Sequence, residues 1–159
     1  MATAKPIPDG YHTMTPYLTI KGASEAMAFY TKAFGAEEIA RMSGPDGMSV
    51  MHAEMKIGDS RLMLGDEWPG MTKSPITLGG SPMGIFMYVQ DVDAAYQRAV
   101  SAGGTSNQPP TDMFWGDRYA KLTDPFGHQW SMATHQRDLT PEEIDKGQKE
   151  WIAQMAKKS

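Results

Sequence analysis

The stretch that decides the fold is "MTPYLTIKGASEAMAFYTKAFG" (residues 14–35), and a similar stretch, "MGIFMYVQDVDAAYQRAVSAGG", follows at residues 83–104. In both, a β-rich alternating segment precedes apolar residues at the 3.6-residue period of a helix, which ends at glycine. Ser24 is the expected cap of the first helix. Aligning Gly35 with Gly104 brings the two stretches into register without a gap. The chain is therefore predicted to repeat one structural unit.

Each predicted helix is followed by strand and hairpin signals. "EEIARMS" is a plausible strand, and "MSVMHAEMKI" and "SRLMLGDE" flank the two-residue turn "GD" (58–59). In the second half, "TDMFWGDRYAKLTD" and "HQWSMATH" flank the turn "PFG". The sequence thus predicts an α+β fold, with two tandem strand–helix–strand–strand–strand modules that form a curved sheet around a cup.

The boundaries follow from the turn residues. We expect one domain over residues 1–159, with the first module at 14–67 and the second at 83–135. The connection at 68–82 is rich in proline and glycine and is predicted to be a linker.

A C-terminal helix is predicted at 140–157. Thr140 is an N-cap residue, a proline takes the first helical position, and a glutamate completes a capping box. Ile144, Trp151 and Met155 fall on one face of this helix, and that apolar face needs a cover.

Composition excludes several classes of function. The 159 residues carry a net charge of −4, which disfavours a nucleic-acid partner because phosphate binding needs a basic surface. The chain has no cysteine, so it has no disulfide, thiolate metal site or cysteine nucleophile. The longest apolar runs are far shorter than the roughly 20 residues that cross a bilayer, and the N-terminus lacks a signal-peptide pattern. We expect a cytoplasmic protein without a membrane partner.

Three segments resemble a known family. They are "YLTIKGASEAMAFYTKAFGAEE", "HAEMKIGDSRLMLGDE" and "WGDRYAKLTDPFGHQWSMATHQRDLTPEE". Together they are similar to the vicinal oxygen chelate superfamily, which includes glyoxalase I, bleomycin-resistance proteins and extradiol dioxygenases. The ending "DPFGHQW…TH" resembles the PhnB-like subgroup. The resemblance implies the two-module fold, a small-molecule ligand in the cup, and a homodimer.

The resemblance also locates a metal site. Metal-dependent members bind one divalent ion through four inward side chains, and the aligned positions here are Thr15, Met63, Gly84 and Ser131. Glycine has no side chain, methionine offers a soft thioether, and the hydroxyls are neutral. We therefore expect no metal and no other cofactor.

His52 and Glu54 are the candidate catalytic residues. Pairing around the "GD" turn sets Glu54 opposite Met63, so His52 and Glu54 point together into the cup. One interpretation is a general base or a relocated half of a metal site. The other, which we favour, is an ion pair that lines a polar cavity.

The remaining histidines are weaker candidates. His128 is expected on the helix-facing side, at the rim beside the turn. His135 falls on the cup side at the far end of its strand, and His12 lies in the N-terminal arm. Trp130 lies between His128 and His135 in the sequence and is expected in the core.

Alternation along the strands predicts an aromatic cup with a few polar groups, which suits a planar or drug-sized organic ligand. The expected ligand-binding residues are Tyr17, Met63, Phe86, Tyr88, Trp115, Asp117, Tyr119, Lys121 and Ser131. The alternative is that the aromatic residues fill the barrel, Phe86 first. Within "FWGDR" (114–118), Gly116 permits close backbone approach, and Asp117 could instead pair with Arg118 or Lys121.

Three functions compete at this point. The first is metal-free binding of a small, aromatic organic molecule, as in bleomycin-resistance proteins. The second is a lyase, isomerase or dioxygenase with a relocated metal at His52 and Glu54, or with His52 as a metal-free base. The third is a structural dimer with no ligand. The missing metal ligands and the aromatic cup favour the first.

Overall fold

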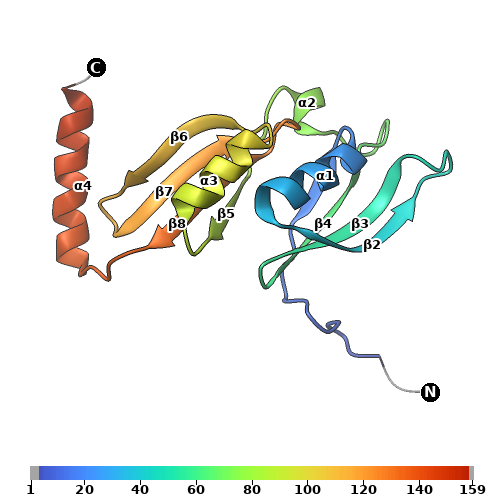
Figure 1. Cartoon of the computed structure of the whole chain (residues 1–159), viewed down its shortest axis with the longest axis horizontal. Coiled ribbons are helices and arrows are strands. Elements are labelled where there is room, and N and C mark those ends of the chain that lie inside the picture. The colour runs from blue at the N-terminus through green and yellow to red at the C-terminus, as the bar shows by residue number, and fades with distance from the viewer. Residues whose placement is uncertain (1–3, 158–159) are drawn as a thin grey trace.

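A computed structural model describes residues 4–157 and shows two four-stranded sheets, one in each module (Figure 1). The first module contains β1 (Tyr17–Ile20), α1 (Ala23–Phe34), β2 (Glu37–Ser43), β3 (Val50–Ile57) and β4 (Ser60–Asp66). The second contains β5 (Gly84–Tyr88), α3 (Val92–Ser101), β6 (Thr105–Asp112), β7 (Asp117–Thr123) and β8 (Gln129–His135). The strand orders are β1-β4-β3-β2 and β5-β8-β7-β6, so the predicted repeat is confirmed.

The sequence predicted one curved sheet around a cup. The structure has two separate four-stranded sheets that do not close into one. A short helix, α2 (Pro75–Leu78), lies inside the connection that the sequence suggested was a loop. Ser74 caps it by accepting a hydrogen bond from the Thr77 backbone N–H at 3.3 Å. This helix has four residues, too few for a helical period to be visible in the sequence.

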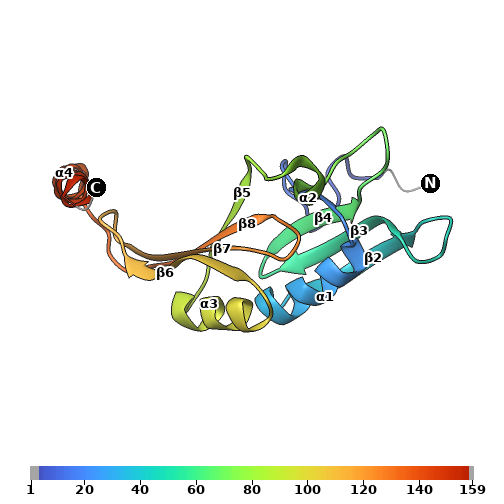
Figure 2. The same ribbon diagram turned by 90° about the horizontal axis from the view of Figure 1, so that it is seen from above.

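Helices α1 and α3 lie side by side and cover the same side of both sheets (Figure 2). The core lies between these helices and the inner strand residues. The residues predicted to face the second helix are fully buried: Ala120, Leu122, Trp130 and Met132. On the first module, strand alternation alone would place Met51 of β3 on the helix-facing side with Ala53 and Met55, but this residue is 39% exposed. A register shift between Met42 and Ser43 buries Val50 at the start of β3 instead.

The N-terminus of α1 is capped by a residue remote in sequence. Gly22, in the left-handed region at φ 89°, is the N-cap, and Ser24 lies inside the helix, so the predicted serine cap is wrong. Asp66 at the end of β4 accepts hydrogen bonds from the backbone N–H groups of Gly22 and Ala23 at 3.1 and 2.8 Å. Sequence reasoning looked only for a local cap, whereas this one comes from a neighbouring strand.

The β7–β8 turn joins the two modules. Gly127, at φ 88°, donates its N–H to the Asp124 carbonyl at 3.1 Å, which confirms the predicted turn at Pro125–Gly127. The buried Asp124 carboxylate accepts hydrogen bonds from Tyr30 Oη of α1 at 2.8 Å and from Trp130 Nε1 at 2.9 Å. His128 lies 3.1 Å from the Thr19 carbonyl through Nε2 and is buried at the rim. His128 is therefore structural, as its predicted orientation indicated.

The C-terminal helix α4 (Pro141–Ala156) lies beyond the second module, far from α1 (Figure 1). Its capping box is formed as predicted, with Thr140 Oγ1 accepting from the Glu143 N–H and Glu143 accepting from the Thr140 N–H. None of its residues is buried. Trp151 of this helix contacts Phe114 of the β6–β7 connection, with ring centroids 6.0 Å apart. Within residues 4–157, no helix is long and apolar enough to cross a membrane.

Candidate functional site

The faces of the two sheets opposite α1 and α3 are not covered by helices (Figure 2). Large apolar side chains point out of these faces: Tyr17 is 52% exposed, Phe86 49% and Tyr88 66%. Phe86 and Tyr88 are neighbours, with ring centroids 5.2 Å apart, and exposed apolar surface of this kind marks a binding surface. The two uncovered faces carry different chemistry, one mainly polar and the other aromatic.

The first module carries the polar cluster. His52 lies between two partners, with Nδ1 3.4 Å from Tyr17 Oη and Nε2 3.5 Å from Glu54 Oε1. The His52 and Tyr17 rings also stack, with centroids 5.7 Å apart. The structure thus brings His52 and Glu54 together on the predicted face, although their contact is long for a hydrogen bond.

The N-terminal arm covers this polar cluster. Tyr11 Oη donates a hydrogen bond to Glu54, and the Arg61 guanidinium lies over the Tyr11 ring, 5.1 Å from its centroid. The hydrogen bonds from Tyr11 and His52 lower the pKa of Glu54. A cavity of about 330 Å³ lies between the arm and the sheet, lined by Ile7, Tyr11 and Glu54 among others. The ionised form of Glu54 is therefore favoured, and its carboxylate already has Tyr11 and His52 as partners.

The second module carries four aromatic residues that we call the aromatic platform: Phe86, Tyr88, Trp115 and Tyr119. The ring centroids of Phe86 lie 5.2 Å from Tyr88 and 5.9 Å from Tyr119, and Trp115 lies 5.9 Å from Tyr119. These offset and edge-on contacts are favourable for aromatic pairs. Beneath the rings, Ser131 is within hydrogen-bond distance of Tyr119 Oη at 2.8 Å. Phe86 is half exposed, so it does not fill a closed barrel.

Asp117 lies buried at one end of the aromatic platform. Its carboxylate accepts hydrogen bonds from Tyr88 Oη and Trp115 Nε1, both at 3.1 Å, and from His135 Nδ1 at 2.7 Å. The alternative pairing with Arg118 or Lys121 is wrong, because Arg118 instead binds Asp93 and Asp112.

The Asp117 network depends on the β6–β7 turn. A Cβ atom at Gly116 would lie 2.3 Å from the Arg137 carbonyl oxygen, so the close approach expected at this glycine is present. Gly116 also adopts a positive φ of 98°, which side chains rarely tolerate. The glycine therefore lets residues 136–139 pass directly over the turn that positions Trp115 and Asp117.

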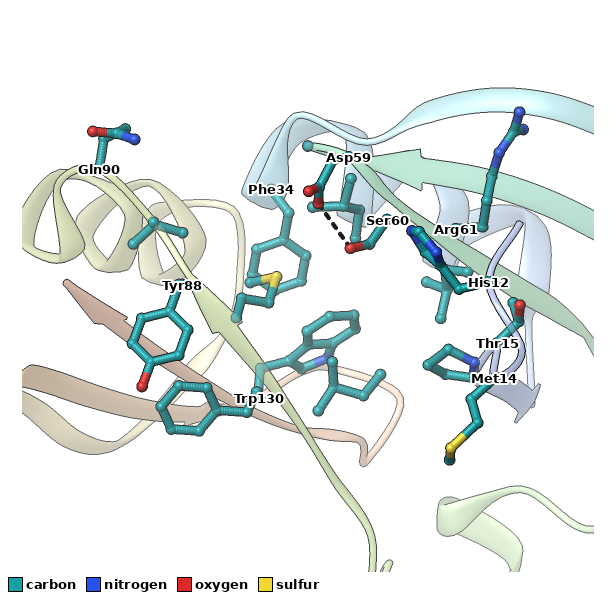
Figure 3. Close-up of a pocket in the computed structure, with 18 residues that line it drawn as sticks. His12, Met14, Thr15, Phe34, Asp59, Ser60, Arg61, Tyr88, Gln90 and Trp130 are labelled. Atoms are coloured by element: carbon teal, nitrogen blue, oxygen red, sulfur yellow. Dashed lines mark hydrogen bonds between the residues drawn. The ribbon is translucent and has the colours of Figure 1, made fainter. Parts of the chain in front are cut away.

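A cavity of about 820 Å³ lies where the two modules meet (Figure 3). Tyr88 lies on one side of it, and His12 and Arg61 lie on the opposite side (Figure 3). Phe34 and Trp130 lie between them. Phe86 and Tyr88 are the only predicted ligand-binding residues in its lining, while Glu54 and Met63 line the smaller cavity. The remaining predicted residues lie on the two sheet faces, so the structure divides the predicted site between separate places.

Sequence reasoning missed the part that the N-terminal arm plays. Tyr11 and His12 precede β1 and carry no periodic signal, so nothing in the sequence placed them against β3 and β4. It also left His135 without a partner, although strand alternation put His135 and Asp117 on the same side. Asp117 of β7 is paired with His135 of β8, and for that reason the two side chains meet.

The donor chemistry at the four ancestral metal positions does not suit a divalent ion. Ser131 is a neutral hydroxyl bonded to Tyr119, Met63 is a thioether, and Gly84 has no side chain. Thr15 offers one further hydroxyl. Across residues 4–157, no group of three or more histidine, aspartate or glutamate side chains is placed to hold a metal. The side chains at these four positions thus do not supply the donor set that the resemblance implies for a divalent metal.

This pair of modules and its open cup define a class of protein. The model of the glyoxalase/bleomycin resistance protein/dioxygenase superfamily matches residues 11–132, and the chain belongs to that superfamily. It is 42% identical over 135 residues to the uncharacterized protein Rv0887c of Mycobacterium tuberculosis strain H37Rv, covering 82% of this chain and 79% of Rv0887c.

Two solved structures share the fold. TnmS3, an antibiotic binding protein from Streptomyces sp. CB03234, has a TM-score of 0.59 at 24% identity, covering 79% of this chain and 97% of TnmS3. A PhnB protein from Bacillus cereus, described as a putative 3-demethylubiquinone-9 3-methyltransferase, has a TM-score of 0.60 at 20% identity, with coverages of 77% and 99%. The predicted superfamily is confirmed by the family model.

Proposed function

We propose that this protein binds a small, planar aromatic molecule, without using a divalent metal. The observation that carries the proposal is the aromatic platform, where Phe86 and Tyr88 expose about half or more of their surface to solvent. Exposed aromatic faces provide a large area of apolar contact at a low cost in side-chain entropy. The fold is compatible with this role, since TnmS3 is an antibiotic binding protein.

The ligand would lie between the aromatic platform and the large cavity. Phe86 and Tyr88 belong to both, so a ring stacked on them would lie at the mouth of this cavity. A cavity of about 820 Å³ is within the size range of drug-sized ligand sites. Polar groups at its far side, His12 and Arg61, can orient the ligand.

A second copy of the chain is the proposed macromolecular partner. In one chain the aromatic platform on the second sheet remains exposed, and α4 presents Trp151, Ile152 and Met155 with 42–54% of their surfaces exposed. A homodimer would cover both surfaces and would complete the walls around the ligand.

The catalytic alternative at His52 and Glu54 has less support. A general base needs an accessible lone pair and a pKa near the working pH. Here Tyr11 and His52 both hydrogen-bond to Glu54, and the pKa of Glu54 is lowered. The cluster is better suited to shaping a polar wall than to abstracting a proton.

A thermal-shift screen tests the proposal. Aromatic compounds that bind the folded chain must raise its Tm, because ligand binding stabilises only the native state. The Phe86→Ala variant should lose this shift, measured against its own ligand-free Tm. Ile39→Ala is the matched control, because Ile39 is an exposed apolar residue of β2, in the other sheet. A panel of aromatic compounds that leaves the Tm of the native chain unchanged would contradict the proposal.

A further inference from the structure

We propose that the ligand is an aromatic acid, and that His135 binds its acidic group at the end of the aromatic platform. This inference rests on the proposed function, which places the ring of the ligand on the aromatic platform. It adds the charge of the ligand and the residue that recognises that charge.

Asp117 fixes His135 beside the aromatic platform. The Asp117 side chain is 4% exposed, and its carboxylate accepts hydrogen bonds from Tyr88, Trp115 and His135. Because the three donors share one carboxylate, the imidazole lies next to two rings of the platform. Asp117 is thus a positioning residue that holds Nδ1 and leaves Nε2 as the contact atom of His135.

The outer nitrogen of His135 already faces a carboxylate. Nε2 lies 3.0 Å from Asp138 Oδ1, and the Asp138 side chain is fully exposed in the segment between β8 and α4. Each ring nitrogen thus faces a carboxylate, and the two hydrogen bonds raise the pKa of His135. An exposed ion pair such as His135–Asp138 contributes little free energy, so a ligand carboxylate can replace Asp138.

The imidazole contact favours an acid over a neutral ring. An imidazolium donates a charge-assisted hydrogen bond to an oxyanion, which is roughly twice as strong as a neutral bond. The buried Asp117 carboxylate already accepts from Tyr88, Trp115 and His135, so it serves to hold the imidazole. The fitting ligand class is a planar aromatic carboxylic acid.

Two probes with the same ring system test the inference. 2-Naphthoate carries a carboxylate, and 2-naphthamide is its neutral counterpart. Isothermal titration at about pH 6, where histidine is largely protonated, should show 2-naphthoate binding about tenfold more tightly to the native chain. In His135→Gln this preference should vanish, while the affinity for 2-naphthamide stays the same.

A second variant tests the same contact by an expected gain in affinity instead of a loss. Asp138→Asn removes the competing carboxylate and should tighten 2-naphthoate binding several-fold, with no effect on 2-naphthamide. Asp9→Asn, which removes an equal charge from the N-terminal arm, is the control and should change neither affinity.

The outcomes separate the two proposals. Equal affinities of the native chain for the two probes would overturn the aromatic-acid inference and leave aromatic binding intact. A preference that persists in His135→Gln would do the same. Binding of neither probe would contradict the proposed function itself, and this inference with it.

Discussion

Asp124 is a buried carboxylate whose partners come from both modules. It is 4% exposed and accepts side-chain hydrogen bonds from Tyr30 and Trp130, together with the backbone N–H groups of Phe126 and His128. Asp124→Ala should therefore lower the free energy of unfolding by about 3 kcal/mol, because four donors lose their acceptor.

Urea unfolding measures this effect. Asp59→Ala, in the exposed β3–β4 turn, is the matched control and should cost less than about 0.5 kcal/mol. A loss of stability in Asp124→Ala no larger than in the control would show that this carboxylate does not hold the modules together.

His135 gives a pH-dependent prediction. Its pKa is raised above the ordinary value of 6.5, first by the hydrogen bond to Asp117 and then by Asp138. A raised folded-state pKa means that the contribution of His135 to stability is complete below about pH 6.5 and is lost as the pH rises through the folded-state value. An NMR titration should place the His135 midpoint above 6.5, and Asp138→Asn should lower it. A midpoint at or below 6.5 in the native chain would contradict the two ion pairs.

At the scale of elements, the capping of α1 shows where local reasoning ends. The sequence favoured Ser24, yet Asp66 accepts the N–H groups of Gly22 and Ala23 and also that of Val50 at 2.7 Å. We expect Asp66→Ala to cost about 2 kcal/mol of stability, as lost caps and buried donors do. Ser24→Ala should be close to neutral, because Ser24 lies inside the helix. Equal costs in urea unfolding would contradict the assignment of the cap.

The contact between α4 and the β6–β7 connection gives a second element-scale prediction. A Cβ atom at Gly147 would lie 2.9 Å from Phe114 Cβ, so this glycine allows Phe114 to pack on the helix. Gly147→Ala normally favours a helix by about 1 kcal/mol. Here it should displace Phe114 and make the segment before α4 more sensitive to protease. Gln148→Ala, at the next position, should not. Slower proteolysis of Gly147→Ala would contradict this packing.

Strand alternation and turn residues predicted much of this architecture. The pairing of Glu54 with Met63 and the buried Trp130 follow from the two hairpins, and they are confirmed. Contacts between segments remote in sequence could not be predicted. The arm residue Tyr11 binds Glu54 across 43 positions, and such a contact has no local pattern. The ligand-binding roles of the predicted residues remain predictions.

At the scale of the whole molecule, the open faces predict self-association. Sedimentation equilibrium should give a mass of twice the 17.5 kDa of one chain. Ile152→Glu should weaken the dimer, because Ile152 lies among the exposed apolar residues of α4. Gln154→Glu, an equal change of charge at an exposed residue of the same helix, should not. A monomer at all accessible concentrations would contradict the proposed partner.

The central claim is that an aromatic molecule binds on the second module. The most direct measurement is a crystal structure grown with a saturating aromatic ligand from the thermal-shift screen. The account predicts that the ligand ring lies against Phe86 and Tyr88, at the mouth of the cavity of about 820 Å³. A ligand bound only elsewhere on the chain, with the aromatic platform left exposed to solvent, would contradict the account.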